Sequence, residues 1–307
     1  VKPMSYAMPS PHRNAGLCLP LATLLIAACA DDSTSCPAGG DGCPAPEVSS
    51  CVPDGFDAVP ILNGSLQMVT LGQENDYVSL HLSQTGFHEV KSPEAIAKKA
   101  GTVMRKDATF LDIGANIGYY TFMFASLGHR VVAVEPFTMN RRAMEGTLCL
   151  NPHLRSLVKI VPAALTEPVE AENSRCRISQ RLDVEDGKNI GNGILTCSPK
   201  DSFQDCKGAA RCEEVALTTL DQVLAEVDPS SVDVVKIDVE MHECHVLHGG
   251  QTLFSKFKPQ IVKVETDFSA SKACVDDMAA KYGYDLVPDT EQGVDGTSGN
   301  DTIMVRL

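Results

Sequence analysis

The 307-residue sequence lacks any dense run of basic residues. It carries 26 Lys and Arg against 40 Asp and Glu, which gives a net charge of −14. A protein that binds nucleic acid needs clustered Lys and Arg to meet the phosphates. The acidic balance therefore argues against nucleic acid as a principal partner. The hydrophobic content of 43% is ample for one sizeable core with extensions.

A second absence concerns the 12 cysteines, none of which forms a Cys-x-x-Cys pair. That spacing is typical of structural zinc sites. Without the two cysteines of the N-terminal leader described next, ten remain, which is an even number. Disulfide bonds formed in an oxidising compartment are therefore the expected use of these cysteines, although their connectivity stays open.

The sequence also has no uninterrupted apolar run long enough for an ordinary membrane span. Residues 15–30 are apolar and small, but they number 16 and contain Pro20. Ala28-Cys29-Ala30 fits a cleavage site, so residues 1–30 are predicted to be a signal peptide, with an uncleaved signal anchor as the alternative. We expect a protein of the secretory pathway, luminal or secreted, that contacts membrane only through this leader.

Changes in composition along the rest of the chain indicate a linker, a preamble and a main domain. Residues 31–55 are rich in Pro, Gly, Ser and Cys and are expected to form a linker. Residues 56–100 form a preamble that packs on the main domain, with strand-like runs at 66–71 and 77–82 and a short helix from Ser92. Residues 101–307 form the main domain. Within it, 166–213 is a cysteine-containing insertion of short strands.

The stretch 109–118, TFLDIGANIG, organises the main domain. Its apolar start predicts the end of a buried strand, followed by Asp112, Gly114, Asn116 and Gly118. Glycine at 114 lets the backbone turn sharply and approach a ligand closely. The helix expected after Gly118 points unsatisfied N–H groups toward the same place.

A second strand at 130–135 ends in Glu135, 23 residues after Asp112. An acid in this position of a βαβ unit can accept hydrogen bonds from both ribose hydroxyls. Asn116 replaces the second glycine of the dinucleotide pattern, and Asp112 would repel a diphosphate but suits an ammonium group. These features predict S-adenosyl-L-methionine as the cofactor. Small Ala163, near the end of a third strand predicted at 157–165, could let its adenine lie flat.

Further apolar runs predict strands and helices in alternation. Strands are expected at 232–239, 260–265, 284–287 and 302–307, and helices at 140–150, 220–227 and 275–282. The predicted fold is therefore α/β: a Rossmann-like, seven-stranded and mostly parallel sheet with helices on both faces and a terminal β-hairpin.

Acids stand at the ends of four of these strands: Asp112, Glu135, Asp238 with Glu240, and Glu265. Ligands bind beyond the carboxyl ends of strands in such sheets. Asp238, Glu240, His242 and Glu265 are therefore the candidate catalytic residues, with His242 or Glu240 as the general base.

His245 lies near these residues, and it could join His242, Asp238 and Glu240 as metal ligands. Helical histidines near a strand end are more often packed or solvated. No metal site is predicted.

Several segments in this order resemble the FkbM family of S-adenosylmethionine-dependent methyltransferases: FLDIGANIGYYT, VVAVEP, Ala164-Leu165, LTTLDQVL, VDVVKIDVEMHECHVLHGG and IVKVET. The resemblance spans about residues 101–290 and is most specific from Lys236 to Gly249. It implies a class I methyltransferase fold and O-methylation of hydroxyls on sugars, polyketides or other metabolites. It also implies that the residues of the glycine turn and Glu135 contact the cofactor, and that Asp238 and Glu240 lie at its methionine or substrate end. Met241 departs from the family, which usually has glycine there.

The leading hypothesis is an O-methyltransferase that acts on a glycan or small metabolite. A secreted binding protein that kept the fold without turnover is one alternative. A luminal glycosyltransferase that uses Asp238 and Glu240 to bind a metal is another, which Asp112 disfavours. The acceptor, the disulfide pairing and the oligomeric state remain open.

Overall fold

The computed structural model describes residues 48–72, 74, 76–105, 109–180, 189–207, 211–289 and 300–306. The predicted leader at 1–30 and most of the predicted linker lie outside these residues. Within the described part of the chain, no helix has both the length and the hydrophobicity to span a membrane.

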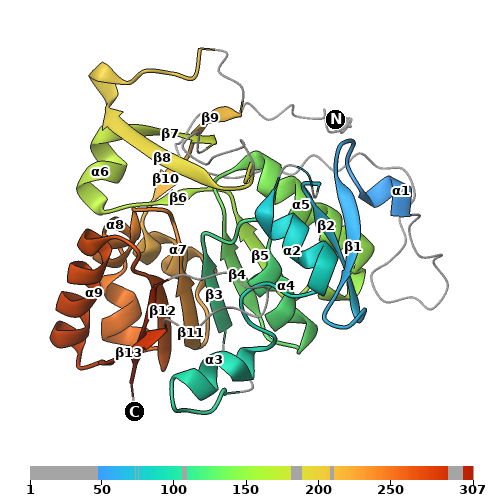
Figure 1. Cartoon of the computed structure of the whole chain (residues 1–307). Helices are drawn as coiled ribbons and strands as arrows, with labels where there is room; N and C mark the ends of the chain where they lie inside the picture. Colours follow the sequence, from blue (N-terminus) through green and yellow to red (C-terminus); the bar gives the residue numbers. More distant parts are fainter. Residues whose placement is uncertain are drawn as a thin grey trace, which may run out of the picture. The chain divides into compact units, whose positions relative to one another are not determined.

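Among the described residues, seven strands form one sheet in the order β13-β14-β12-β11-β3-β4-β5 (Figure 1). Neighbouring strands from β12 to β5 run parallel, whereas β14 is antiparallel to both β12 and β13. This arrangement confirms the predicted α/β fold with its terminal hairpin. The strands are β3 (Thr109–Ile113), β4 (Val131–Val134), β5 (Val158–Val161), β11 (Val232–Ile237), β12 (Ile261–Glu265), β13 (Asp285–Asp289) and β14 (Asp301–Val305).

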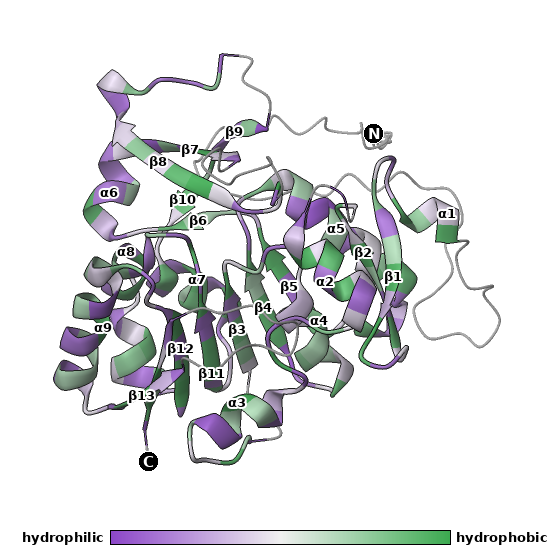
Figure 2. Ribbon diagram, viewed as in Figure 1, coloured by the Kyte–Doolittle hydropathy of each residue, from purple (hydrophilic) through white to green (hydrophobic). Residues whose placement is uncertain are grey.

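The central strands are buried and contain many apolar residues because both faces of the sheet are covered. Alternate residues enter two cores: Phe110 and Val234 pack on one face, Leu111 and Val235 on the other. The first core contains α4 (Tyr119–Ser126) and α5 (Thr138–Leu150); the second contains α7 (Leu220–Val227), α8 (Glu243–His248), the π-helix η4 (Leu253–Phe257) and α9 (Ser269–Tyr282). Figure 2 shows hydrophobic positions along the central strands, with hydrophilic positions among them on β11 and β12.

The preamble covers the face with the first core. It comprises the antiparallel hairpin of β1 (Asp57–Ile61) and β2 (Leu66–Thr70), α2 (Tyr77–Thr85) and α3 (Pro93–Lys99), and it is preceded by α1 (Val48–Cys51). A disulfide joins Cys51 to Cys149 on α5. Cys51 lies within the segment expected to be a linker, so a disulfide attaches this segment covalently to the main domain.

The prediction of a strand at 77–82 is wrong, because these residues form the first part of helix α2. Asp76 caps the helix by accepting a hydrogen bond from the Ser79 N–H at 2.8 Å, and Gly86 ends it with a φ of 73°. Ser79 and Leu82, three residues apart, are its buried side chains. The apparent alternation of apolar residues was therefore misleading, and the caps at both ends decide the structure.

The third predicted strand, 157–165, is also different in the structure. β5 ends at Val161, and after Pro162 the pair Ala164–Leu165 forms β6 in a separate parallel pairing with β10 (Leu217–Thr218). Proline has no N–H to continue the sheet hydrogen bonds, which explains the break.

The insertion follows β6. It contains α6 (Pro168–Asn173) and an antiparallel sheet in which β7 (Ser174–Gln180) lies between β8 (Gly193–Pro199) and β9 (Cys212–Val215). A 3-10 turn at Lys200–Ser202 lies within the insertion, and another at Pro152–Leu154 precedes β5. Disulfides Cys176–Cys197 and Cys206–Cys212 stabilise the insertion. Cys244 and Cys274 form no disulfide, contrary to the expected use of the cysteines, and Cys36 and Cys43 lie outside the described residues.

Candidate functional site

A cavity of about 430 Å³ lies at the carboxyl ends of β3, β4, β11 and β12. The preamble and the insertion also contribute to its wall. Eight of the ten predicted site residues line it: Gly114, Asn116, Glu135, Ala163, Asp238, Glu240, His242 and Glu265. Asp112 and Gly118 are not among the lining residues.

Asp112 is fully buried beneath the glycine turn. Leu111 and Ile113 enter the second core, so the side chain between them points to the opposite face of the sheet, toward α4. There its Oδ2 accepts a hydrogen bond from the Thr121 hydroxyl at 2.6 Å. Burial raises the pKa of Asp112, while Lys236 lowers it. Asp112 therefore joins β3 to α4 instead of presenting its carboxylate to the cavity.

The backbone of Asp238, directly after β11, restricts the residue at the start of the glycine turn. Gly114 has a φ of +77°, and a Cβ placed on it would lie 1.7 Å from the backbone carbonyl oxygen of Asp238. Asn116 has a φ of 52°, in the left-handed region that asparagine tolerates. Gly118, with a φ of +94°, precedes α4, and a Cβ there would lie 2.8 Å from the Phe122 ring.

Glu135 is held in place by backbone groups of the same region. Its Oε2 accepts from the Asn116 N–H and its Oε1 from the Phe137 N–H, both at 2.8 Å. The side-chain amide of Asn140 adds a third hydrogen bond at 3.3 Å. Burial raises the pKa of Glu135 to about 7, although the hydrogen bonds from Phe137 and Asn116 favour the ionised form. Its carboxylate is thus fixed at the cavity wall beside the turn.

Three carboxylates converge at the other end of the cavity. Asp238, Glu240 and Glu265 each bring one oxygen within 4.8 Å of the others. Burial, and then repulsion from Asp238 and Glu240, raise the pKa of Glu265 to about 10. Glu265 therefore holds a proton at neutral pH, and it can donate a hydrogen bond to an oxygen atom of a ligand.

The insertion contacts the cavity through Gly191 and Asn192. The Asn192 side-chain amide donates to Oε1 of Glu240. The Asn140 amide donates to the Gly191 carbonyl at 2.8 Å, and the Gly191 N–H donates to Asp76 at 3.2 Å. These bonds join the insertion to α5 and α2, and they orient the carboxylate of Glu240.

His242 lies at the start of α8 and contacts the beginning of the insertion. Its Nε2 is 3.4 Å from Glu170 and 3.4 Å from the Thr166 hydroxyl, and its ring stacks on His245. Burial and the neighbouring His245 lower the pKa of His242 to about 4. The ring is therefore neutral at pH 7 and can accept a proton.

The comparisons with known proteins identify the family. Residues 112–286, more than half of the chain, match the family described as the Methyltransferase FkbM domain. The chain belongs to the FkbM methyltransferase family. Among curated proteins, the AMB antimetabolite synthetase AmbE of Pseudomonas aeruginosa is 23% identical over 265 residues. That match covers 78% of this chain but only 12% of the length of AmbE.

Two solved structures are similar to parts of this FkbM chain. The methyltransferase FkbM of Methylobacillus flagellatus KT has a TM-score of 0.46 at 14% identity, covering 66% of this chain and 45% of that one. The METTL16 methyltransferase domain has a TM-score of 0.40 at 12% identity, covering 69% of this chain and 64% of that one.

Met241, the departure from the usual FkbM glycine, keeps a glycine-like backbone. Its φ is 76°, directly after Glu240 at 50°. A methionine in this conformation costs roughly 1 kcal/mol relative to glycine. Its side chain is 58% exposed. The substitution therefore keeps the turn that presents Glu240.

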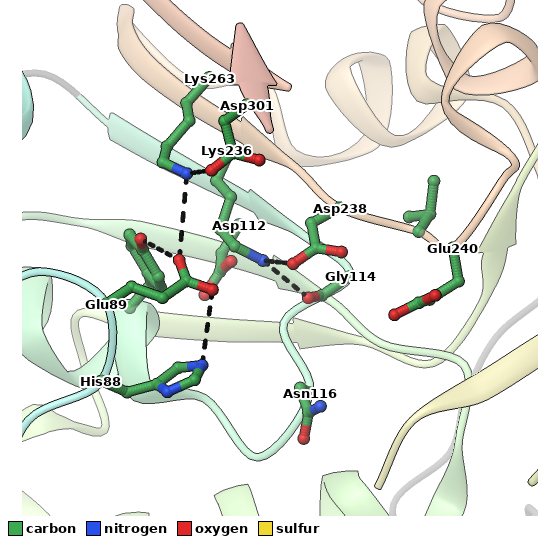
Figure 3. Close-up of polar contacts among 12 residues, drawn as sticks. His88, Glu89, Asp112, Gly114, Asn116, Lys236, Asp238, Glu240, Lys263 and Asp301 are labelled. Atoms are coloured by element: carbon green, nitrogen blue, oxygen red, sulfur yellow. Dashed lines mark hydrogen bonds and ion pairs between the residues drawn. The ribbon is translucent and has the colours of Figure 1, made fainter. Parts of the chain in front are cut away.

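Sequence reasoning missed two buried lysines that line the cavity of this FkbM domain. Lys236 lies in register with Asp112 on one side and with Lys263 on the other. Its Nζ donates to Asp238 at 2.9 Å and to the Gly114 carbonyl at 3.3 Å (Figure 3). The available signal was a lysine inside each of two mainly apolar strands, since a buried charge there must be paired.

Glu89, a residue of the preamble, adds a carboxylate beside these two lysines. Its carboxylate accepts from the Tyr120 hydroxyl at 2.7 Å and lies 3.9 Å from the Nζ of Lys263, which also pairs with Asp301 (Figure 3). Burial opposes its ionisation, but Lys263, with His88, holds the pKa of Glu89 at about 2. The preamble thus supplies an ionised wall of the cavity.

Proposed function

We propose that the protein is an S-adenosyl-L-methionine-dependent methyltransferase that methylates a hydroxyl group of a glycan or small metabolite. The observation that supports it most is the position of Glu135, whose carboxylate is fixed beside the glycine turn at the wall of the cavity. A carboxyl group in this position can accept hydrogen bonds from ribose hydroxyls.

The chemistry of the remaining lining residues fits this cofactor. Asn116 borders the turn, and Ala163 offers a small surface for an adenine ring. Asp238 supplies negative charge for an ammonium or sulfonium group, and Lys236 supplies positive charge for a carboxylate. When bound, the cofactor supplies an electrophilic methyl group on a positively charged sulfur.

The residues around Glu240 have the groups needed for an acceptor hydroxyl. Glu240, oriented by Asn192, or neutral His242 would take the proton from that hydroxyl. Protonated Glu265 would donate a hydrogen bond that holds the oxygen in line with the methyl group. Asp112 would contribute indirectly, because its hydrogen bond with Thr121 joins β3 to α4 and so helps to fix the glycine turn.

An oxidising compartment agrees with three disulfides within the described residues. We therefore propose the secretory pathway as the location. The predicted leader would carry the chain there, and uptake of the cofactor into that compartment would be required.

The test measures binding and transfer separately. S-adenosylhomocysteine binding is followed by calorimetry in the wild type, Glu135→Ala and Glu145→Ala, the last a control at an exposed position of α5. We expect Glu135→Ala to weaken binding at least about tenfold, the loss of a bidentate polar contact. Glu145→Ala should bind like the wild type.

Transfer is followed with tritium-labelled cofactor and a cell-surface glycan fraction. Glu240→Gln should keep S-adenosylhomocysteine binding and lose transfer. Failure of the folded wild type to bind S-adenosylhomocysteine would contradict the proposal. Binding without transfer to glycan or metabolite pools would favour the alternative of a binding protein that has lost turnover.

A further inference from the structure

A fully buried carboxylate with no part in the proposed reaction lies behind the turn that presents Glu240. Glu243 is the first residue of α8. Its Oε1 accepts a hydrogen bond from the Val239 N–H at 3.1 Å. Its Oε2 accepts another from the Ser271 hydroxyl at 2.6 Å. This one side chain therefore joins the segment after β11 to the first turn of α9.

The hydrogen bond with Val239 closes a turn that contains two left-handed residues. Glu240 and Met241 have φ angles of 50° and 76°, and both lie between Val239 and Glu243. Residues with side chains are strained in this region, and they keep such a conformation only where the surrounding structure holds it. The carboxylate of Glu243 bridges the two ends of the turn. It therefore stabilises the backbone conformation in which Glu240 lines the cavity.

The hydrogen bond with Ser271 reaches the element that follows the second predicted acid. Only three residues separate Glu265, at the end of β12, from Ser269, at the start of α9. Ser271 is 3% exposed, so this hydrogen bond lies within the packed contact between α8 and α9. Glu243 is thus connected through a short segment to each of the two acids, Glu240 and Glu265.

The separation of these two acids bears directly on the proposed reaction. There, Glu265 holds the acceptor oxygen and Glu240 is a candidate to take its proton. One oxygen of each, with one of Asp238, lie within 4.8 Å of one another. We propose that Glu243 is a positioning residue, whose two hydrogen bonds set the distance between Glu240 and Glu265. The inference rests on the proposed function, and a displacement of about 1 Å can lower a rate about a hundredfold.

The role requires the two hydrogen bonds of Glu243 and not its charge. Glutamine can keep both, because its amide oxygen accepts from the Val239 N–H and its NH₂ group donates to the Ser271 oxygen. Alanine removes both. Glu243→Ala is therefore the disruptive variant and Glu243→Gln the rescue. Ser271→Ala removes only the contact with α9, and it tests the proposal if Glu243→Ala does not fold.

A second buried carboxylate of the same region provides the control for lost stability. Asp233 is 1% exposed and lies near the start of β11, at the opposite end of this strand from the turn. It accepts a hydrogen bond from the Nε of Arg105 at 2.6 Å. Asp233→Ala should therefore destabilise the fold without altering the turn. Circular dichroism confirms that each variant is folded, and all assays are run well below its melting temperature.

The reaction is followed as tritium transfer from saturating labelled cofactor to the cell-surface glycan fraction, and S-adenosylhomocysteine binding by calorimetry. We expect Glu243→Ala to transfer at least about tenfold more slowly and Ser271→Ala about threefold more slowly, with S-adenosylhomocysteine affinity within about twofold of the wild type. Glu243→Gln and Asp233→Ala should transfer within about twofold of the wild-type rate. A wild-type rate in Glu243→Ala would overturn the proposal. So would an equal loss in Glu243→Gln or in Asp233→Ala.

Hydrogen exchange tests the same role without any reaction. Mass spectrometry of the full chain follows exchange in the peptide that contains residues 238–243. Glu243→Ala should exchange faster there, because the Val239 N–H loses its acceptor, and Glu243→Gln should match the wild type. Unchanged exchange in Glu243→Ala would contradict the proposal. The expected exchange pattern in a wild type that transfers no methyl group would contradict the proposed function alone.

Discussion

The backbone carbonyl oxygen of Asp238 occupies the place where a side chain on Gly114 would begin. A Cβ on Gly114 would lie 1.7 Å from that oxygen. The Asp238 N–H also donates to the Ile113 carbonyl at 3.0 Å, so the ends of β3 and β11 are in direct contact. The glycine that opens the predicted cofactor turn therefore also restricts the position of a predicted catalytic acid.

Gly114→Ala should destabilise the protein strongly and abolish S-adenosylhomocysteine binding. The new methyl group must displace the Asp238 backbone, and alanine is strained at a φ of +77°. We expect a loss of roughly 3 kcal/mol or more in the free energy of unfolding. Gly128→Ala is the matched control, because its φ is +88° but a Cβ there would contact nothing within 4 Å. It should cost only about 1 kcal/mol. Equal losses in guanidinium unfolding would contradict the steric explanation.

Lys236→Met should leave buried carboxylates without their cation. Lys236 is 7% exposed and pairs with Asp238, and nearby carboxylates raise its pKa despite burial. Breaking a fully buried pair costs about 3–5 kcal/mol, and because the Asp238 side chain is 34% exposed we expect a smaller loss of about 2 kcal/mol. Lys159→Met removes an exposed pair with Glu226 and should change stability by less than about 1 kcal/mol. The comparison is made by urea unfolding at pH 7, and similar values for both variants would refute a structural role for the buried pair.

Glu265→Gln should stabilise the protein at alkaline pH. The pKa of Glu265 is raised to about 10 in the folded state, so folding favours its protonated form. The unfolded chain loses this proton near pH 4.5, and stability is then lost as pH rises toward about 10. Glutamine mimics the protonated acid at every pH.

The variant and the wild type should therefore have similar stability at pH 4, since both side chains are then uncharged. The advantage of Glu265→Gln should grow with pH and reach about 1 kcal/mol or more at pH 9. Denaturant unfolding at pH 4, 6.5 and 9 measures it. A constant difference, or a variant that is less stable at pH 9, would argue against repulsion among these carboxylates.

The disulfide between α1 and α5 should contribute more stability than the short-loop disulfide in the insertion. Cys51 and Cys149 are 98 residues apart, and Cys206 and Cys212 are six apart. Chain entropy gives about 4.7 kcal/mol for the long loop and about 2.2 kcal/mol for the short one. Each pair is replaced by serine in a double variant, and thermal unfolding is compared. A larger loss for the Cys206–Cys212 pair would contradict the entropic explanation.

The convergence of the proposed cofactor-binding residues could largely be predicted because they are local in sequence. The turn from Gly114 to Gly118 and the acid Glu135 belong to one strand–turn–helix–strand unit, and the parallel sheet places their ends at one edge. The same logic brings Asp238 and Glu265 to that edge. The α2 helix escaped prediction because its capping residues were not recognised.

The sequence by itself determined the family, the sheet and the glycine turn, because periodicity and short motifs depend on neighbouring residues. Only the tertiary structure decided that Asp112 faces α4, that Lys236 and Lys263 line the cavity with Glu89, and that Glu170 meets the histidines of α8. The physical reason is that charge pairing depends on distances in space. Those distances are set by which face of the sheet a side chain occupies and by which distant segment packs against it.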